Sequence, residues 1–289
     1  MSADRIDVRK TYKLYVGGAF PRSESGRSYV VNDAKGRFLA NAARASRKDG
    51  RDAVVAARKA LPGWVGRTAY NRGQVLYRVA EVLEGRRSQF VDEVGRGEGL
   101  SARKAEAVVD AAVDRWVWYA GWADKLAQVL GNANPVAGPY FNLSTPEATG
   151  VVVAVAPADS SLLGLVSVVA PVVTSGGTVV VLAAENAPLP AITLGEVLAT
   201  SDLPGGVVNV LTGLAGEIAP SLASHRDVDA LDLTGVVDDT LARSLEEAAA
   251  ETLTRVRRAE PGVDWTATPG IDRMRWVLET KTVWHPIGV

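Results

Sequence analysis

Cysteine is absent from all 289 residues of this chain. Without a thiol, the chain can form no disulfide, no thiolate metal site and no cysteine nucleophile. Histidine is scarce, and its two residues, His225 and His285, lie far apart in the sequence and in no recognisable ligand motif. This spacing gives no pattern of metal ligands. The sequence therefore predicts no metal site and no chemistry that depends on a thiol.

Charge of one sign and long apolar runs are also missing. The formal net charge is −1, from 32 basic and 33 acidic side chains, so nothing favours nucleic acid or an anionic membrane as a partner. No apolar stretch is long and free enough of glycine and proline to span a bilayer. The N-terminus lacks the apolar core of a signal peptide. We therefore expect a cytoplasmic chain that binds neither nucleic acid nor membrane.

Short valine-rich runs are what the central part of the chain does contain. They begin near Gly150, Gly176, Gly206 and Val228, and each is followed by turn-forming residues. The segments between the runs are long enough for helices. Continuous β-branched runs that alternate with helices are typical of a parallel sheet covered on both faces. The sequence thus predicts an α/β fold with a Rossmann-like sheet, whose strands end at a nucleotide-type site.

Elements of other kinds flank this core. A hairpin around Gly17 and Gly18 is predicted near the N-terminus, and Ser46 with Asp49 is a plausible helix N-cap. An aromatic cluster of Trp116, Trp118 and Trp122 is predicted to pack in the core. The other predicted strands are residues 28–31, 38–42, 140–145 and 275–284, and the other predicted helices are residues 46–60, 68–84, 87–94, 101–130 and 240–257.

Several motifs in order resemble the aldehyde dehydrogenase superfamily over nearly the whole chain. The close matches are residues 204–213, which read PGGVVNVLTG, and residues 223–225, which read ASH, and residues 233–235 match more weakly. The order and spacing of these motifs carry the resemblance. The remaining matching segments are residues 14–20, residues 53–60 with Trp64, residues 119–125, which read YAGWADK, and residues 281–284.

The resemblance implies a three-part design: an NAD(P)-binding domain, a thiol-bearing catalytic domain and a small oligomerisation sheet. We expect residues 1–139 to form the N-terminal hairpin and the helical part of the NAD(P)-binding domain. Residues 140–155 would form an oligomerisation hairpin that leads into the Rossmann-like part, residues 156–262. Residues 263–289 would be a connector and an oligomerisation tail. The family's catalytic domain is replaced by this short connector.

The catalytic roles that the resemblance implies have no suitable residues here. The family's nucleophile is a cysteine, and this chain has none. The stretch that matches the family's Pro-Trp-Asn oxyanion motif ends in Asp159, and a carboxylate repels an oxyanion. The position of the general-base glutamate holds Ala259, with Glu260 one place beyond. We therefore assign no catalytic residue.

The resemblance also places a cofactor site for NAD or NADP, in an altered form. Glu185 occupies the position of the family's ribose-binding glutamate, whereas Leu182 replaces the lysine of the same turn. Gly235 begins the stretch that matches the pyrophosphate-binding motif. Asp238 and Asp239 follow it and disfavour a pyrophosphate at the helix start.

Gly213 is the third candidate cofactor residue, on the adenine side of the site. The alternative interpretation is structural, with Glu185 a solvated carboxylate and Gly213 a loop glycine. We favour the structural interpretation, and expect NAD or NADP to bind weakly at most.

Three functions remain open at this point. The first is a non-catalytic subunit that associates with a full-length aldehyde dehydrogenase, whose strand would pair with an open sheet edge. Self-association through Trp116, Tyr119 and Trp122 is the lesser form of this hypothesis. The second is a module that still binds NAD(P). The third is an active oxidoreductase, which the missing cysteine opposes.

Overall fold

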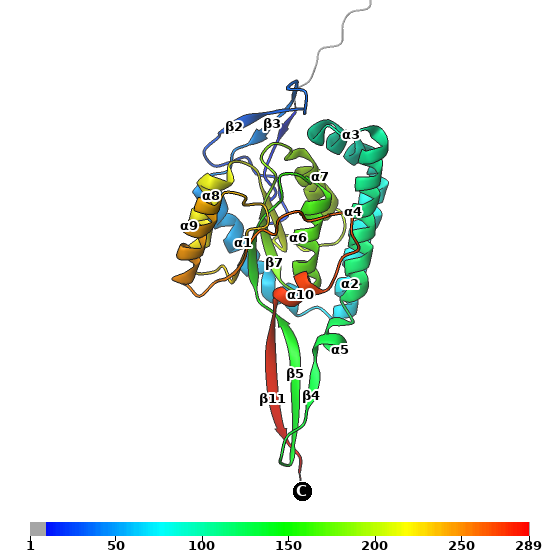
Figure 1. Ribbon diagram of the computed structural model, residues 1–289, viewed down its shortest axis with the longest axis vertical. Helices are drawn as coiled ribbons and strands as arrows, with labels where there is room; N and C mark the ends of the chain where they lie inside the picture. Colours follow the sequence, from blue (N-terminus) through cyan, green and yellow to red (C-terminus); the bar gives the residue numbers. More distant parts are fainter. Residues whose placement is uncertain (1–9, 289) are drawn as a thin grey trace, which may run out of the picture.

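Three β-sheets organise the computed structural model, which describes residues 10–288 (Figure 1). Residues 1–9 and 289, at the two ends of the first and last predicted segments, lie outside the described residues. The central sheet is parallel, with strand order β10-β9-β6-β7-β8, and confirms the predicted α/β fold. Its strands are β6 (Val151–Val155), β7 (Thr178–Leu182), β8 (Val208–Leu211), β9 (Ala230–Asp232) and β10 (Arg255–Arg257).

The helices cover both faces of this sheet. The N-cap predicted at Ser46 is confirmed, because its side chain accepts from the Asp49 amide while the Asp49 carboxylate accepts from the Ser46 amide. The helices are α1 (Arg47–Val65), α2 (Ala69–Gly85), α3 (Arg87–Glu98), α4 (Ala102–Trp122), α5 (Leu126–Leu130), α6 (Leu163–Thr174), α7 (Leu189–Leu198), α8 (Ala215–Ala223), α9 (Asp239–Ala250) and α10 (Asp272–Trp276).

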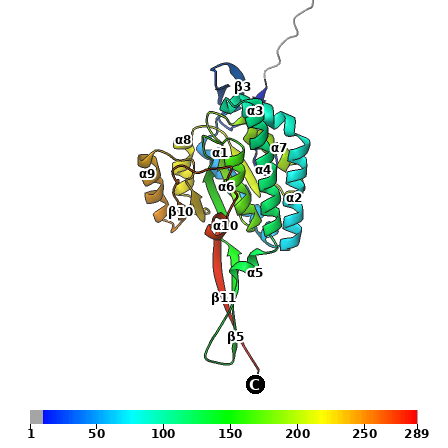
Figure 2. The ribbon, with the colours of Figure 1, turned by 45° about the vertical axis from the view of Figure 1, so that its right-hand side comes forward.

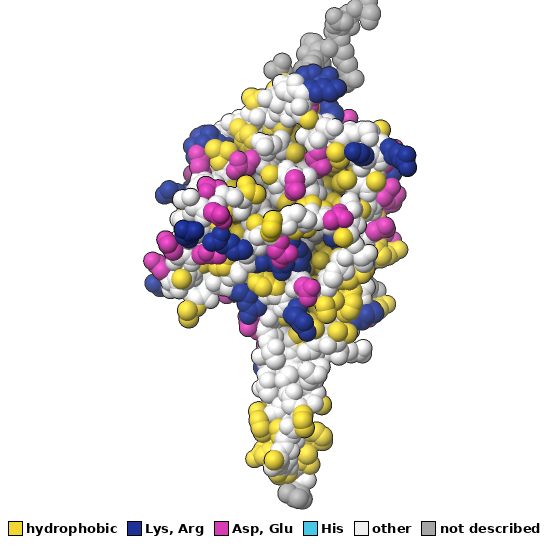
Figure 3. Space-filling view, in the orientation of Figure 1, with side chains coloured by type: hydrophobic (Ala, Val, Ile, Leu, Met, Phe, Trp, Pro, Cys, Tyr) yellow, Lys and Arg dark blue, Asp and Glu magenta, His cyan; other side chains and the backbone are white. Residues whose placement is uncertain are grey.

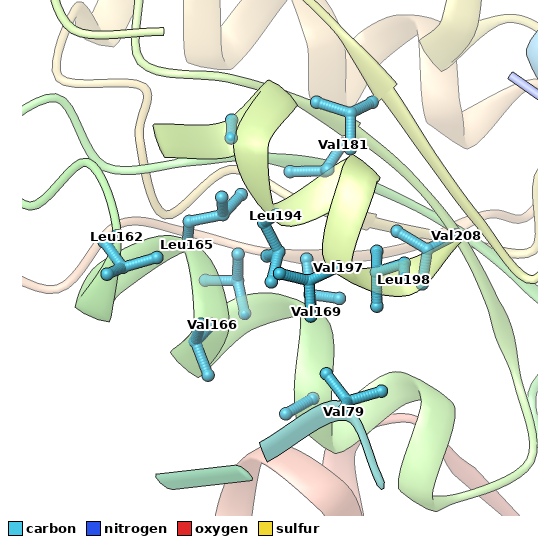
Figure 4. Close-up of a cluster of buried hydrophobic side chains, with 14 of the residues drawn as sticks. Val79, Leu162, Leu165, Val166, Val169, Val181, Leu194, Val197, Leu198 and Val208 are labelled. Carbon is cyan, nitrogen blue, oxygen red and sulfur yellow. The ribbon is translucent and has the colours of Figure 1, made fainter. Parts of the chain in front are cut away.

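Two hydrophobic cores lie against the two faces. Successive residues of a strand point to opposite sides, so in β7 Val179 and Val181 enter one core, whereas Val180 and Leu182 enter the other. The first core contains α6 and α7, with α2, α3 and α4 outside them (Figures 2 and 4). The second core contains α1, α8 and α9. This two-sided burial explains why the central strands read as continuous apolar runs.

The N-terminal sheet differs from the predicted hairpin. Val16 and Ala19 pair across the turn at Gly17 and Gly18, whose φ angles are 63° and 82°, and the Leu14 amide donates to the Pro21 carbonyl at 3.1 Å. The residues before Leu14 pair elsewhere, because β1 (Thr11–Tyr12) lies parallel to β3 (Phe38–Ala43), which also pairs with β2 (Ser28–Asn32). The hairpin prediction was therefore correct for the turn and the pairs beside it, and wrong for the start of the first strand.

A third sheet projects from the body and is called the stalk (Figure 1). It consists of β4 (Asn132–Asn134), β5 (Tyr140–Ala148) and β11 (Leu278–Pro286), in the antiparallel order β11-β5-β4. The prediction of one hairpin over residues 140–155 was wrong. The chain turns at Gly150 (φ 133°), and β6 enters the central sheet instead. All five residues of β6 are buried apolar side chains, which need cover on both faces.

Two long predicted helices end earlier than expected. The helix predicted over residues 101–130 is divided, because α4 ends at Trp122 and α5 follows. The helix predicted over residues 240–257 ends at Ala250, and Leu253 has φ 56°, a left-handed value that no helix continues. Thr254 Oγ1 then donates to the Val228 carbonyl at 3.1 Å, and β10 pairs with β9.

The tryptophan cluster is part of the core, as predicted. Trp116 is 0% exposed and Tyr119 is 1% exposed, while Trp118 and Trp122 pack against the same core from its rim. Trp116 and Tyr119 do not reach the surface of this chain, so self-association, which was predicted through Trp116, Tyr119 and Trp122, stays a prediction in which only Trp122 is partly exposed. Within residues 10–288, no helix combines the length and the apolar character that crossing a membrane requires.

Candidate functional site

A pocket of about 590 Å³ lies where β6, β9 and β10 end. Strand order reverses between β6 and β9, since β7 and β8 lie on one side of β6 and β9 and β10 on the other. The carboxyl ends of strands at such a reversal are where open α/β sheets bind ligands. The lining residues are 157–159, 234–237, Asp239, 258–263 and Trp265.

Gly235 is the one predicted cofactor residue that lines this pocket. Its amide donates to the Val155 carbonyl at 2.9 Å, which joins the loops after β9 and β6. A Cβ at this position would lie 2.1 Å from the Ala156 carbonyl oxygen. The close approach of two backbones therefore requires a glycine here, with or without a cofactor.

The start of α9 is already occupied by carboxylates of the chain itself. Asp238 caps the helix, and its Oδ1 accepts from the Thr240 amide at 2.9 Å. The next residue, Asp239, accepts from Arg258 at 3.1 Å, and Arg258 also binds Glu246 at 2.7 Å. Two negative side chains at this helix start do not fit a pyrophosphate, which needs free amides and a positive end.

Glu185 and Gly213 lie together, but neither lines the pocket. Glu185 Oε1 accepts from the amide of Ala215, the first residue of α8, at 2.6 Å. The Tyr29 hydroxyl donates to the Glu185 carbonyl at 3.3 Å. Burial, followed by the Glu185 charge, raises the pKa of Tyr29. Glu185 therefore stabilises the start of a helix, and only its second oxygen is left for a ribose hydroxyl.

Gly213 is required by the backbone around it. Its φ is 135°, and a Cβ there would lie 3.1 Å from the Ala45 amide nitrogen. The neighbouring Thr212 carbonyl accepts from that same amide at 2.8 Å. The structural interpretation of Gly213 thus has a direct physical reason, and its assignment to a cofactor stays a prediction.

The two positions that the resemblance assigns to the oxyanion donor and the general base come together in the pocket. Asp159 and Ala259 both line it, with Glu260 beside Ala259, although Ala259 lies about a hundred residues from Asp159 along the sequence. Arg258 is the pocket's one lining cation among the described residues, and it is paired with Asp239. At the position of the oxyanion donor the pocket therefore offers a carboxylate, which accepts hydrogen bonds and donates none.

Sequence reasoning missed Glu98, which lies behind Asp159. Its Oε1 accepts from the Ser161 amide at 2.7 Å and from the Ser161 hydroxyl at 2.6 Å. Burial raises the pKa of Glu98, and the charge of Asp159 adds to the rise. No local motif marks Glu98, because its partner is 63 residues away. Among residues 10–288, no group of His, Asp and Glu is arranged to hold a metal ion.

Comparisons with known proteins agree with this architecture. The profile of the aldehyde dehydrogenase family matches residues 20–265. Human retinal dehydrogenase 2 is 31% identical over 249 residues, which are 84% of this chain and 47% of that protein. Cytosolic aldehyde dehydrogenase 1 of Elephantulus edwardii is 29% identical over 255 residues, 85% of this chain and 49% of that protein.

Solved structures give the same result. The NAD-dependent aldehyde dehydrogenase of Sinorhizobium meliloti superposes with a TM-score of 0.81 at 27% identity, over 86% of this chain and 49% of that one. PnpE of Pseudomonas sp. WBC-3 gives a TM-score of 0.80 at 26% identity, over 86% and 50%. The chain spans about half the length of the relatives it matches. The matched residues and the shared fold show that this chain belongs to the aldehyde dehydrogenase family.

Proposed function

We propose that this chain is a non-catalytic member of its family that acts as a subunit beside a full-length aldehyde dehydrogenase. The observation that carries the proposal is the short segment between β10 and β11, where the family's catalytic domain would lie. In the structure, the segment between β10 and β11 is residues 258–277, and it is called the connector from here on. It includes only one short helix, α10. The family's nucleophile would belong to a domain between these two strands, and no cysteine occurs anywhere in the chain.

The pocket chemistry supports the same proposal. Asp159 stands where a donor to the oxyanion is needed, and Ala259 stands where a general base is needed. Covalent aldehyde oxidation requires a nucleophile, a base and oxyanion donors at one place. With all three roles unfilled, aldehyde turnover by this chain is expected to be absent.

The stalk supplies the surface for a partner subunit. Both its edge strands, β4 and β11, have an unpaired side within residues 10–288. Apolar side chains gather at its far end, where Phe141 is 57% exposed and Trp284 is 58% exposed (Figure 3). An open apolar edge of this kind binds an added strand, or aggregates. A full-length family member retains the domain that this chain lacks and could offer such a strand.

Residual binding of NAD or NADP is the second candidate function. It is supported by the intact parallel sheet, by the pocket at its strand reversal and by the NAD-dependent relative from Sinorhizobium meliloti. The carboxylates of Asp238 and Asp239 at the start of α9 oppose it. We therefore expect weak affinity, and micromolar binding in calorimetry would favour this second function over the first.

Activity is tested by measuring aldehyde oxidation with NAD and with NADP. We expect no turnover above a blank without protein, and no gain from Asp159→Asn, because the thiol would still be missing. Turnover clearly above the blank would refute the non-catalytic assignment.

Partnering is tested by purifying the tagged chain from its native host and by mass spectrometry of what accompanies it. A full-length aldehyde dehydrogenase is the expected partner. Val283→Lys, on β11, should release it because a charge enters the apolar stalk. Val30→Lys, on β2, is the matched control, since Val30 is 56% exposed and Val283 is 43% exposed. Retention of the partner by Val283→Lys, or a chain that purifies alone as a monomer, would contradict the proposal.

A further inference from the structure

A second, smaller cavity lies behind the main pocket. Its volume is about 180 Å³, and it lies between α4, the end of β10, the connector and α10. Val263 and Trp265 line both cavities and form the wall between them. Three arginines line the smaller cavity, from three different elements: Arg115 from α4, Arg257 from β10 and Arg273 from α10. No proposed function of the main pocket uses them.

Arg115 is a buried cation with neutral partners. It is 7% exposed. It donates to the Ser167 hydroxyl at 2.8 Å, to the Trp265 carbonyl at 2.7 Å and to the Ala267 carbonyl at 2.9 Å. Within residues 10–288 it has no carboxylate partner, and burial lowers the pKa of its guanidinium. A buried charge without a counter-charge is unfavourable, so this guanidinium has a strong preference for an anion.

The other two guanidiniums converge on the same place. The Arg257 Nε is buried and has no hydrogen-bond partner, although another nitrogen of the group pairs with Glu260. Arg273 donates to Asp232 at 3.2 Å, and its guanidinium lies 5.3 Å from the centre of the Trp265 ring.

Tyr119 also lines the cavity, and its hydroxyl is close enough to interact with the charges of all three arginines. Burial raises the pKa of its hydroxyl to about 12, and the positive charges of all three arginines oppose that rise. One buried hydroxyl therefore lies within the electrostatic reach of every guanidinium.

Two carboxylates also line the cavity and must be counted. Asp264 accepts from the amide and the hydroxyl of Thr266, at 2.9 and 2.7 Å, so it is engaged in its own turn. Asp272 begins α10. Neither pairs with Arg115. Arg257 pairs with Glu260 and Arg273 with Asp232, so Arg115 is the one lining guanidinium, among the described residues, that has no carboxylate partner.

We propose that this arginine cavity binds one small oxyanion, the carboxylate or phosphate group of a small molecule. Guanidinium groups bind both with paired, planar hydrogen bonds. The volume fits a single such group with few further atoms, and it is too small for a dinucleotide. The ligand would join α4, β10 and α10 around the connector, independently of any cofactor in the main pocket.

The proposal is tested by titrating the whole chain with inorganic phosphate and, separately, with acetate, at constant ionic strength made up with sodium chloride. Binding is followed by tryptophan fluorescence, since Trp265 lines the cavity, and by calorimetry. Trp265→Phe should abolish the fluorescence change. Tighter phosphate binding would indicate a phosphate ligand, and tighter acetate binding a carboxylate ligand. Absence of saturable binding by both anions would overturn the proposal.

Three variants separate the cavity from general charge effects. Arg273→Gln and Arg115→Gln should weaken the tighter anion at least tenfold. Arg275→Gln is the matched control, since Arg275 lies on the same helix as Arg273, carries the same charge and does not line the cavity. The affinity of this variant for the anion should stay within twofold of the wild-type affinity. Arg115→Gln could unfold the connector, so Arg273→Gln carries the test if circular dichroism shows that loss. Equal weakening by Arg275→Gln would overturn the proposal.

Discussion

Close packing requires glycine at two positions, one of them in the pocket. Gly235, which lines the pocket, faces the Ala156 carbonyl, and Gly150, outside it, faces the Asp229 side chain, whose Oδ2 would lie 2.0 Å from an added Cβ. The Asp229 carboxylate accepts from the Val151 amide at 2.7 Å and from Arg58 at 2.6 Å, so it cannot move away freely. A glycine that resembles a cofactor residue can therefore be needed for folding alone.

Gly235→Ala separates these two roles. The added methyl would collide with the backbone, so we expect a loss of about 2–3 kcal/mol in the free energy of unfolding, without any nucleotide present. Gly216→Ala is the control, because nothing lies within 4 Å of its Cβ position in α8. That change should be neutral or add about 0.5–1 kcal/mol. Chemical denaturation measures both, and a fully stable Gly235→Ala would refute the packing explanation.

Glu98 makes the stability of the folded chain depend on pH, and the direction of this dependence follows from the raised pKa. Its folded pKa is raised above the reference value of 4.5, mainly by burial. The folded chain therefore holds this proton more tightly than the unfolded chain, so stability from Glu98 is greatest below pH 4.5 and falls as the pH rises through the folded pKa.

Glu98→Gln tests this sign. The amide oxygen can still accept from Ser161, but the variant carries no charge to desolvate. We expect the wild type to lose stability relative to Glu98→Gln over a pH range that starts near 4.5 and extends upward. Urea denaturation across this range measures the difference, and Glu247→Gln, an exposed glutamate on α9, is the control. An unchanged difference across the range would contradict the burial effect.

Helix α9 ends where the backbone conformation of Leu253 and the pairing of β10 with β9 both prevent its continuation. After α9, the chain passes through Leu253 in a left-handed conformation and then forms β10 at the sheet edge. The Leu253 side chain is 93% exposed and therefore gains little from packing there. A non-glycine residue in this conformation costs about 1–2 kcal/mol.

Leu253→Gly should therefore stabilise the chain. Glycine adopts the same backbone conformation without the steric cost, although it also gains freedom in the unfolded chain. We expect a net gain of about 0.5–1 kcal/mol in thermal or chemical unfolding. Leu241→Gly, inside α9, is a contrasting change that should destabilise. A loss of stability in Leu253→Gly would mean that the exposed leucine makes contacts important for the turn.

The molecule consists of a body, formed by the central sheet and the helices that cover it, and of the stalk, which projects from the body. β11 pairs with β5 along nine positions, yet its residues after Leu278 are exposed. The connector is held to the body by Arg115 and by Arg255, which donates to the Trp276 carbonyl at 2.6 Å. The stalk is therefore a sheet of its own, separate from the central sheet of the body.

Deletion of residues 281–289 tests this division. The body should keep its helical circular dichroism and its cooperative unfolding, because residues 281–288 are exposed. Association with a partner subunit should be lost, as measured by size-exclusion chromatography of the mixture. Loss of cooperative unfolding would show that the stalk and the body fold as one unit.

The sequence by itself determined the parallel sheet, the family and the absence of cysteine. Valine runs, turn residues and motifs are local patterns, and the absence of cysteine is plain from composition. Only the tertiary structure decided how residues 140–155 divide between two sheets and where Glu98 and Arg115 find their partners. Ser161 lies 63 residues from Glu98, and Ala267 lies 152 residues from Arg115. Contacts over such separations leave no periodic signal, because burial and pairing arise only when distant elements pack together.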